Sequence, residues 1–176
     1  MIINKKIVFL GYMGSGKSAI AKLISKKLDL INVDLDNYIE KKENKSIRNI
    51  FKISGDLYFR KIENKYLKDL LNSDNNKIIS LGGGTPCYSD NIELIIESKC
   101  IIFYLRANVD TLADRLFNER DKRPLISRIK SKKDLKTFIS KHLFERNQFY
   151  LKSNFIIDVD KKTENEITNE CISLLS

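Results

Sequence analysis

The stretch Gly11-Tyr12-Met13-Gly14-Ser15-Gly16-Lys17-Ser18 decides the fold of this chain. An apolar run over residues 7–10 precedes it, and a helical pattern over residues 18–28 follows it. In this strand–turn–helix setting, G-x-x-x-x-G-K-[ST] forms a P-loop, because glycine lets the backbone N–H groups face a phosphate chain at a helix N-terminus. Lys17 can reach the β- and γ-phosphates, and the Ser18 hydroxyl can bind Mg²⁺. The stretch therefore predicts ATP or GTP binding, with a chance glycine-rich turn as the alternative.

The composition fits one domain with an anionic partner. The chain has 176 residues and a formal net charge of +9, which suits either nucleic acid or a phosphorylated small molecule. The Lys and Arg residues are spread along the chain, and no aromatic-basic module is present. We therefore expect no nucleic-acid partner as the main role.

The cysteines indicate a reducing compartment. Cys87, Cys100 and Cys171 are an odd number and show no C-x-x-C spacing, so a disulfide framework or zinc site is not expected. We expect Cys100 and Cys171 to be buried. The apolar run near the N-terminus ends after four residues, which is too short for a signal peptide or a membrane span. These features predict a cytoplasmic protein without a membrane partner.

Strands and helices alternate along the chain in the order typical of an α/β protein. We expect strands at residues 6–10, 30–33, 78–81, 100–105 and 155–157. Helices are expected at residues 18–28, 37–42, 47–53, 56–71, 90–97, 110–118, 135–150 and 164–175.

A carboxylate pair follows the second expected strand. Asp34 and Asp36 lie two residues apart, so their side chains point to the same side of an extended chain. Ligands of parallel sheets bind at the carboxyl ends of the strands. The pair therefore suits Mg²⁺ binding or a general base for a substrate hydroxyl. The alternative is that Asp36 merely caps the following helix.

Three further features have both a functional and a plain structural interpretation. Gly82-Gly83-Gly84 ends a strand, which indicates close approach to the backbone or simply a flexible loop. Arg60 could bind an anion or lie on the surface. The basic segment around residues 119–134 is interpreted as a lid that excludes water, or as a solvated loop. His142, the single histidine, is interpreted as structural, so any general base must be a carboxylate.

Taken together, these motifs resemble the shikimate kinase family over nearly the whole chain. The resemblance rests on the P-loop, Asp34-x-Asp36, Ile50-Phe51 with Gly55, Phe59-Arg60-x-x-Glu63, Ser80-Leu81-Gly82-Gly83-Gly84, Arg123-Pro124-Leu125, and Arg146 with Tyr150. It implies a three-layer α/β/α fold with a five-stranded parallel sheet, like that of nucleoside-monophosphate kinases, and a lid insertion. It also implies transfer of the ATP γ-phosphoryl group to the 3-hydroxyl of shikimate, a step of aromatic amino-acid biosynthesis.

The resemblance also implies roles for individual residues. Lys17, Asp36 and Arg123 would be catalytic, with Asp36 receiving the proton of the attacking hydroxyl. Ser18 and Asp34 would hold Mg²⁺. The shikimate-binding residues would be Asp36, Arg60, Gly82, Gly83, Gly84 and Arg146, with the two arginines pairing with the carboxylate. ATP would be bound by Gly14, Ser15, Gly16, Lys17, Ser18, Ala19, Arg120 and Arg123.

Some assignments stay open at this stage. Arg115 and Arg120 compete for the arginine that packs on adenine, and Arg120 is favoured. We expect a monomeric single domain over residues 1–176, with the lid at about 119–134 and a substrate-binding helical region at about 36–63. The rival functions are another small-metabolite P-loop kinase such as a gluconate kinase, a nucleotide-dependent nucleic-acid-binding protein, and an inactive P-loop binding module.

Overall fold

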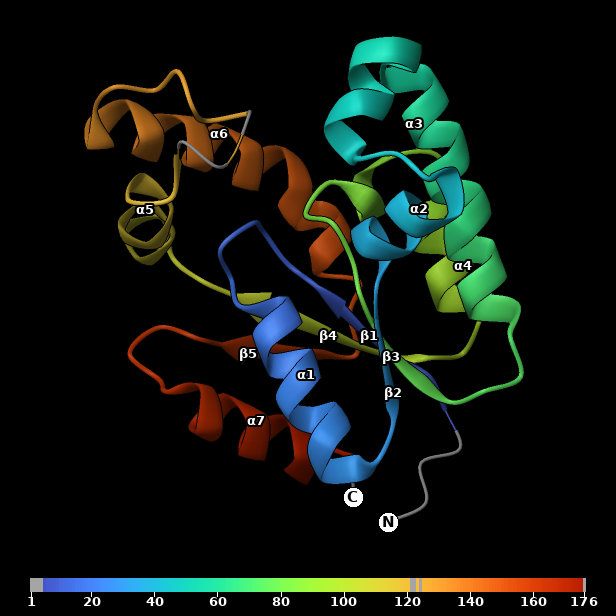
Figure 1. Ribbon diagram of the computed structural model, residues 1–176. Coiled ribbons are helices and arrows are strands. Elements are labelled where there is room, and N and C mark those ends of the chain that lie inside the picture. The colour runs from blue at the N-terminus through green and yellow to red at the C-terminus, as the bar shows by residue number, and fades with distance from the viewer. Residues whose placement is uncertain (1–4, 121–122, 124, 176) are drawn as a thin grey trace.

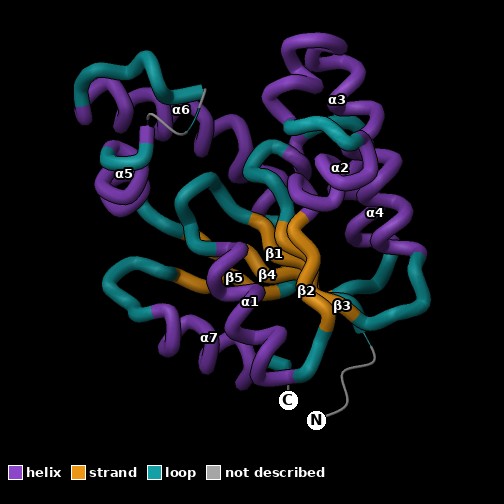
Figure 2. Tube along the Cα trace, in the orientation of Figure 1, coloured by secondary structure: helices purple, strands orange, loops and turns teal. Residues whose placement is uncertain are grey.

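The computed structural model describes residues 5–120, 123 and 125–175, and within them all strands form one parallel sheet. The strands are β1 (Ile7–Leu10), β2 (Ile31–Asp34), β3 (Lys77–Ser80), β4 (Ile101–Arg106) and β5 (Phe155–Asp158). Their order across the sheet is β2-β3-β1-β4-β5 (Figures 1 and 2). The predicted α/β class and five-stranded parallel sheet are confirmed.

Helices cover both faces of this sheet, so that the fold has three layers. They are α1 (Lys17–Leu28), α2 (Leu35–Glu43), α3 (Ile47–Asn72), α4 (Asn91–Glu97), α5 (Val109–Phe117), α6 (Lys132–Tyr150) and α7 (Glu164–Ser173). A short 3-10 turn, η1 (Thr85–Cys87), follows β3 and was not predicted. Among the described residues, none of these helices has the length and apolar character needed to cross a membrane.

The sheet separates two hydrophobic cores because side chains alternate between its faces. Ile7 and Phe9 of β1 belong to a core with α1, α5, α6 and α7, whereas Val8 and Leu10 belong to a core with α2, α3 and α4. All four residues are fully buried. This explains why the strand is a continuous apolar run, as expected for a parallel strand covered on both faces.

The strand order places two loops next to each other. β1 lies between β3 and β4, while β2 lies outside β3, so the chain crosses over at this point of the sheet. The loops after β1 and β3 therefore follow the carboxyl ends of two adjacent parallel strands, which we call the carboxyl edge of the sheet. In open parallel sheets this edge is where ligands bind. Figure 1 shows α2 and α3 on one side of the β1–α1 loop and α5 and α6 on the other.

Two of the predicted helices are joined at a kink. The structure has one element, α3, in place of helices 47–53 and 56–71, but Gly55 within it has φ 79° and ψ 177°. That backbone conformation is accessible essentially only to glycine. The predicted break at Gly55 is therefore present as a sharp change in direction.

The helix that follows the expected lid begins earlier than predicted. Ser131 caps α6, with its Oγ accepting a 3.0 Å hydrogen bond from the backbone N–H of Asp134. The helix therefore starts at Lys132 rather than at residue 135. The basic composition of this first turn concealed the Ser-x-x-Asp start signal.

Candidate active site

The P-loop occupies the turn between β1 and α1. Gly11, Gly14 and Gly16 have positive φ angles of 142°, 81° and 97°, which a residue with a Cβ rarely adopts. The loop wraps around Lys17, whose Nζ donates hydrogen bonds to the carbonyl oxygens of Gly11, at 2.9 Å, and Tyr12, at 3.0 Å. The loop therefore holds the lysine ammonium at its centre.

The buried position of Lys17 destabilises its charged form. It lowers the pKa of Lys17 to about 8, with the carboxylates of Asp36 and Asp34 acting in the opposite direction. The nearby positive charge of Arg123 is a smaller cause of the same lowering of the pKa. A polyphosphate beside Lys17 would stabilise its charged form.

Ser18 and Asp34 lie side by side at the start of α1 and the end of β2. Ser18 Oγ donates a 2.8 Å hydrogen bond to Asp34 Oδ2. Asp34 also caps α2, since its Oδ1 accepts a 3.3 Å hydrogen bond from the N–H of Asn37. The alternative in which Asp36 caps this helix is therefore wrong, because Asp36 lies inside the first helical turn.

Asp36 faces the triple-glycine loop. A Cβ added to Gly82 would lie 3.2 Å from Asp36 Oδ1. Burial is the main reason why the pKa of Asp36 is raised to about 6; the carboxylates of Asp34 and Glu63 contribute to this rise, and Lys17 opposes it. At neutral pH the group is an ionised carboxylate with unusually high basicity, which suits a general base.

The triple glycine is a point of close approach and not only a flexible loop. A Cβ on Gly83 would lie 3.1 Å from the backbone N of Met13 in the P-loop, and one on Gly84 would lie 3.7 Å from Arg60 Nη2. The prediction of close approach is confirmed. The loop thus brings Asp36, the P-loop and Arg60 together.

Arg60 is held by a buried carboxylate. Its Nη1 donates a 2.7 Å hydrogen bond to Glu63 Oε2, and its guanidinium stacks 3.7 Å from the ring centroid of Tyr88. Glu63 is only 1% exposed, and its Oε1 accepts a 2.7 Å hydrogen bond from Thr85 Oγ1. Arg60 is therefore a fixed part of the site and not a loose surface residue.

Arg146 reaches the same region from α6. Burial raises the pKa of the Cys87 thiol to about 11, and the charges of Arg146 and Arg60 both oppose this. The two guanidinium groups therefore lie within electrostatic reach of one thiol. Tyr150, one turn after Arg146, donates a short hydrogen bond from its hydroxyl to the carbonyl oxygen of Gly83, which ties α6 to the glycine loop.

The arginines beyond β4 occupy different places. Arg115 Nη1 donates a 3.0 Å hydrogen bond to the carbonyl oxygen of Gly14 in the P-loop. Arg120 stacks 4.4 Å from the Phe117 ring centroid, and Arg123 pairs with Glu119 at 3.0 Å. Residues 121, 122 and 124 of the expected lid lie outside the described residues. Arg115 is thus the arginine seen against the P-loop, although Arg120 was favoured from the sequence.

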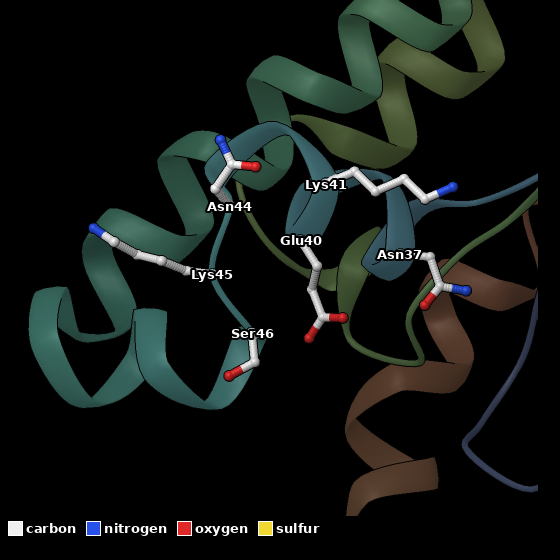
Figure 3. A pocket seen from close by; sticks show the side chains of 6 residues that line it. All are labelled: Asn37, Glu40, Lys41, Asn44, Lys45 and Ser46. Atoms are coloured by element: carbon white, nitrogen blue, oxygen red, sulfur yellow. The ribbon is translucent and has the colours of Figure 1, made fainter.

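A separate hollow of about 430 Å³ lies between α2 and the start of α3. Its lining residues are Asn37, Glu40, Lys41, Asn44, Lys45 and Ser46, and Figure 3 shows Lys41 and Lys45 extending away from it in opposite directions. None of the residues predicted for the site lines it. Glu40, one of the lining residues, connects α2 to the start of α3, because its Oε1 accepts a 2.7 Å hydrogen bond from the N–H of Ile47.

Sequence reasoning missed the side chains that hold the site in place. Glu63 was noted only as part of a motif, and Tyr12 only as a variable position of the P-loop. The structure buries both, at 1% exposure each, and pairs them with Thr85 and His142. A glutamate on an otherwise apolar helix face was the available signal for Glu63.

The P-loop, the adjacent carboxylates and the parallel sheet define a P-loop kinase with a fold like that of nucleoside-monophosphate kinases. Comparisons with known proteins identify the family of this kinase. A family model described as shikimate kinase matches residues 13–176. The shikimate kinase of Flavobacterium johnsoniae is 44% identical over 98% of this chain and 99% of its own length.

Solved structures of shikimate kinases have the same fold. The shikimate kinase of Bacteroides thetaiotaomicron has a TM-score of 0.84 and 30% identity, covering 97% of this chain and 98% of its own. The shikimate kinase of Acinetobacter baumannii, solved in complex with shikimate, has a TM-score of 0.86, covering 97% and 92%. At 23% identity, this second likeness shows the fold alone. The chain belongs to the shikimate kinase family.

Proposed function

We propose that this protein transfers the γ-phosphoryl group of ATP to the 3-hydroxyl of shikimate, giving shikimate 3-phosphate and ADP. The observation that carries the proposal is the convergence of Asp36, Arg60 and the P-loop on one glycine loop, with contacts of 3.1–3.7 Å to the Cβ positions of Gly82, Gly83 and Gly84. A relative of the same fold has been solved with shikimate bound. Family membership and this convergence support the same acceptor.

On the donor side, the P-loop from Gly14 to Ala19 would hold the ATP phosphates through backbone N–H groups and the positive end of α1. Lys17 would neutralise charge on the β- and γ-phosphates, and Arg123 would do so from the lid. Arg115 is the better candidate for the arginine beside the nucleotide, because it contacts Gly14. Arg120 remains a candidate for the adenine side of the lid.

On the acceptor side, Arg60 and Arg146 would bind the shikimate carboxylate. A guanidinium group offers two parallel donors that match the two carboxylate oxygens. Glu63 fixes Arg60, so little side-chain entropy would be lost on binding. Asp36 and the backbone of Gly82–Gly84 would bind the ring hydroxyls beside it.

The chemical step would then depend on position and charge. Asp36 is an ionised carboxylate at neutral pH, and its pKa of about 6 lets it accept the proton of the attacking hydroxyl. Lys17 and Arg123 would stabilise the charge that spreads over the transferred phosphoryl group.

We also propose that Mg²⁺ is required. Ser18 Oγ and Asp34 Oδ2 are 2.8 Å apart, so a hydroxyl and a carboxylate face one point at the end of the P-loop. Magnesium in such sites uses one or two protein oxygens and completes its shell with water and phosphate oxygens. The pair fits the ion. A bound Mg²⁺ would reduce the repulsion among the negative charges of the phosphates and their repulsion of the attacking hydroxyl oxygen.

We extend the proposal to the lid and acceptor-binding segments, the oligomeric state and the cellular location of the protein. The segment 119–134 would act as a lid over ATP, and residues 36–63 would form the acceptor-binding region of a single domain. The protein would act as a monomer on small-molecule substrates. A cytoplasmic location would suit Cys87, Cys100 and Cys171, all of which are free thiols.

The direct test is Mg²⁺-dependent ADP release from ATP, measured with and without shikimate. We expect a large shikimate-dependent increase and a product that carries phosphate at the 3-position in phosphorus NMR. Gluconate and nucleoside monophosphates are the control acceptors, and neither should stimulate ADP release. Stimulation by gluconate alone would keep the P-loop kinase and overturn the acceptor assignment. No turnover with any acceptor would favour an inactive binding module.

A further inference from the structure

One face of α6 contacts both loops of the site. Phe138, His142, Arg146 and Tyr150 follow each other at intervals of four residues, which places them on one side of the helix. The Phe138 and His142 rings lie 4.1 Å apart, and the Tyr150 hydroxyl donates to the carbonyl oxygen of Gly83. The two middle residues of this face, His142 and Arg146, both contact Tyr12 of the P-loop.

Tyr12 therefore links the P-loop to α6 through its side chain. Its hydroxyl lies 3.1 Å from His142 Nδ1, and the Arg146 guanidinium lies over its ring, 5.5 Å from the centroid. A guanidinium at this distance from an aromatic face is attracted by the electrons of the ring. The backbone of the same residue contacts the catalytic lysine, since the Tyr12 carbonyl oxygen accepts a hydrogen bond from Lys17 Nζ.

The hydroxyl of Tyr12 has a defined partner. Tyr12 is 1% exposed, and a buried hydroxyl without a hydrogen bond would be costly. Burial raises the pKa of Tyr12 to about 12, and burial together with Arg146 lowers the pKa of His142. At neutral pH a protonated phenol therefore shares a hydrogen bond with a nitrogen of a neutral imidazole. This hydrogen bond holds the hydroxyl end of the ring that lies beneath Arg146.

We propose that Tyr12 is a positioning residue for the acceptor: its ring, oriented by His142, supports the Arg146 guanidinium in the pose that binds the substrate carboxylate. The proposal rests on the carboxylate-binding role proposed above for Arg146. It assigns a specificity function to a P-loop position whose side chain contacts α6. It also gives His142 a role, through Tyr12, that extends beyond core packing.

The test is steady-state kinetics of the full chain with two acceptors, shikimate and its methyl ester. Tyr12→Leu removes the ring and should raise the KM for shikimate about three- to tenfold. The KM for ATP and kcat should stay within about twofold, because the backbone contacts of Tyr12 are retained. The KM for the ester should not change, because the ester carries no negative charge for Arg146 to bind. Tyr12→Phe removes only the hydrogen bond, whereas His142→Ala removes it together with the imidazole ring that packs on Phe138. Both variants should give a smaller rise in the KM for shikimate.

Tyr104→Phe is the matched control. Tyr104 is also buried, at 2% exposure, and its hydroxyl donates a 3.0 Å hydrogen bond to Asn147 of the same helix. Losing this bond should lower the melting temperature without raising the KM for shikimate. A merely structural role for Tyr12 would give the same pattern as this control, and that result would overturn the proposal.

The double variant Tyr12→Leu/Arg146→Ala separates this proposal from the proposed function. If Tyr12 acts through Arg146, Tyr12→Leu should add nothing to the KM for shikimate once Arg146 is removed. Multiplying effects, or an equal rise in the KM for ATP, would contradict the positioning role. If Arg146→Ala itself left the KM for shikimate unchanged, the carboxylate role of Arg146 would fail first. If Tyr12→Leu does not fold, non-additive effects of Tyr12→Phe and His142→Ala on the KM for shikimate decide the question.

Discussion

Ser18 Oγ donates a 2.8 Å hydrogen bond to Asp34 Oδ2, which joins the first turn of α1 to the end of β2. The two residues are 16 positions apart, and β2 is separated from β1 by β3 in the sheet. The contact therefore spans the width of β3, on the side of the sheet where the strands end and the P-loop follows β1. It brings together the hydroxyl and carboxylate that we propose as magnesium ligands.

Lys17 should be indispensable for turnover. Lys17→Ala removes the one ammonium group that the P-loop wraps, so charge on the transferred phosphoryl group would lose its nearest neutralising partner. We expect kcat to fall by about a thousandfold or more, measured as ADP release at saturating shikimate. The exposed Lys22 of α1 provides a control, and Lys22→Ala should behave like the unmodified protein. Near-normal kcat in Lys17→Ala would refute the P-loop assignment.

Asp36→Asn should lower activity and raise stability. The folded-state pKa of Asp36, about 6, lies above the value of about 4 for an unfolded aspartate, so the ionised carboxylate destabilises the fold. This cost is fully present above about pH 6 and absent below about pH 4. We expect kcat to fall while ATP still binds, and the free energy of unfolding to rise on the order of 2 kcal/mol at pH 7.5.

Thermal melts of both proteins at pH 7.5 and pH 4 check the stability difference. It should shrink at the lower pH, where Asp36 is protonated. Unchanged activity in Asp36→Asn would remove Asp36 from the proton-accepting role, whatever the melts show.

Activity should fall in mild acid. A general base must be ionised, and Asp36 becomes protonated as the pH drops through about 6. We expect kcat/KM for shikimate to decline about tenfold per pH unit below this value, since this ratio reports groups of the free enzyme. A profile that stays flat down to pH 5 would contradict the raised pKa or the role of the residue.

Arg60→Ala should affect the acceptor and the fold together. We expect the KM for shikimate to rise about 10- to 100-fold, because a charge-assisted bidentate pair is lost, while the KM for ATP changes little. The buried Glu63 would lose its 2.7 Å partner, so stability should fall by roughly 1–3 kcal/mol. Lys61→Ala, at an exposed position next to Arg60, is the control. A change in the KM for ATP alone would show that Arg60 does not bind the carboxylate.

Arg115 and Arg120 can be separated by their effects on ATP. Arg115 donates to the carbonyl oxygen of Gly14, so Arg115→Ala should raise the KM for ATP about five- to tenfold by loosening the P-loop. Arg120 stacks on Phe117 and should matter less. Measuring the KM for ATP of both variants at saturating shikimate decides between them. A larger effect of Arg120→Ala would restore the preference that the sequence suggested.

Much of the fold was predictable because its signals are local. Residues 7–28 contain the whole strand–turn–helix signal, and the alternating pattern of apolar strands and amphipathic helices can be recognised without knowledge of distant contacts. The break at Gly55 was also local, since glycine alone tolerates that backbone conformation. Helix starts were less predictable: α6, capped by Ser131, begins at Lys132, three residues before the expected position.

By itself, the sequence determined the phosphate-binding loop, the α/β class and the resemblance to one kinase family. Only the tertiary structure decided which side chains meet. Asp34 rather than Asp36 caps α2, Arg115 rather than Arg120 contacts the P-loop, and Tyr12 pairs with His142 across 130 positions. The physical reason is that the sequence signals for helices, turns and apolar strands lie in residues close together in the chain, whereas a hydrogen bond between distant residues depends on how sheet and helices pack.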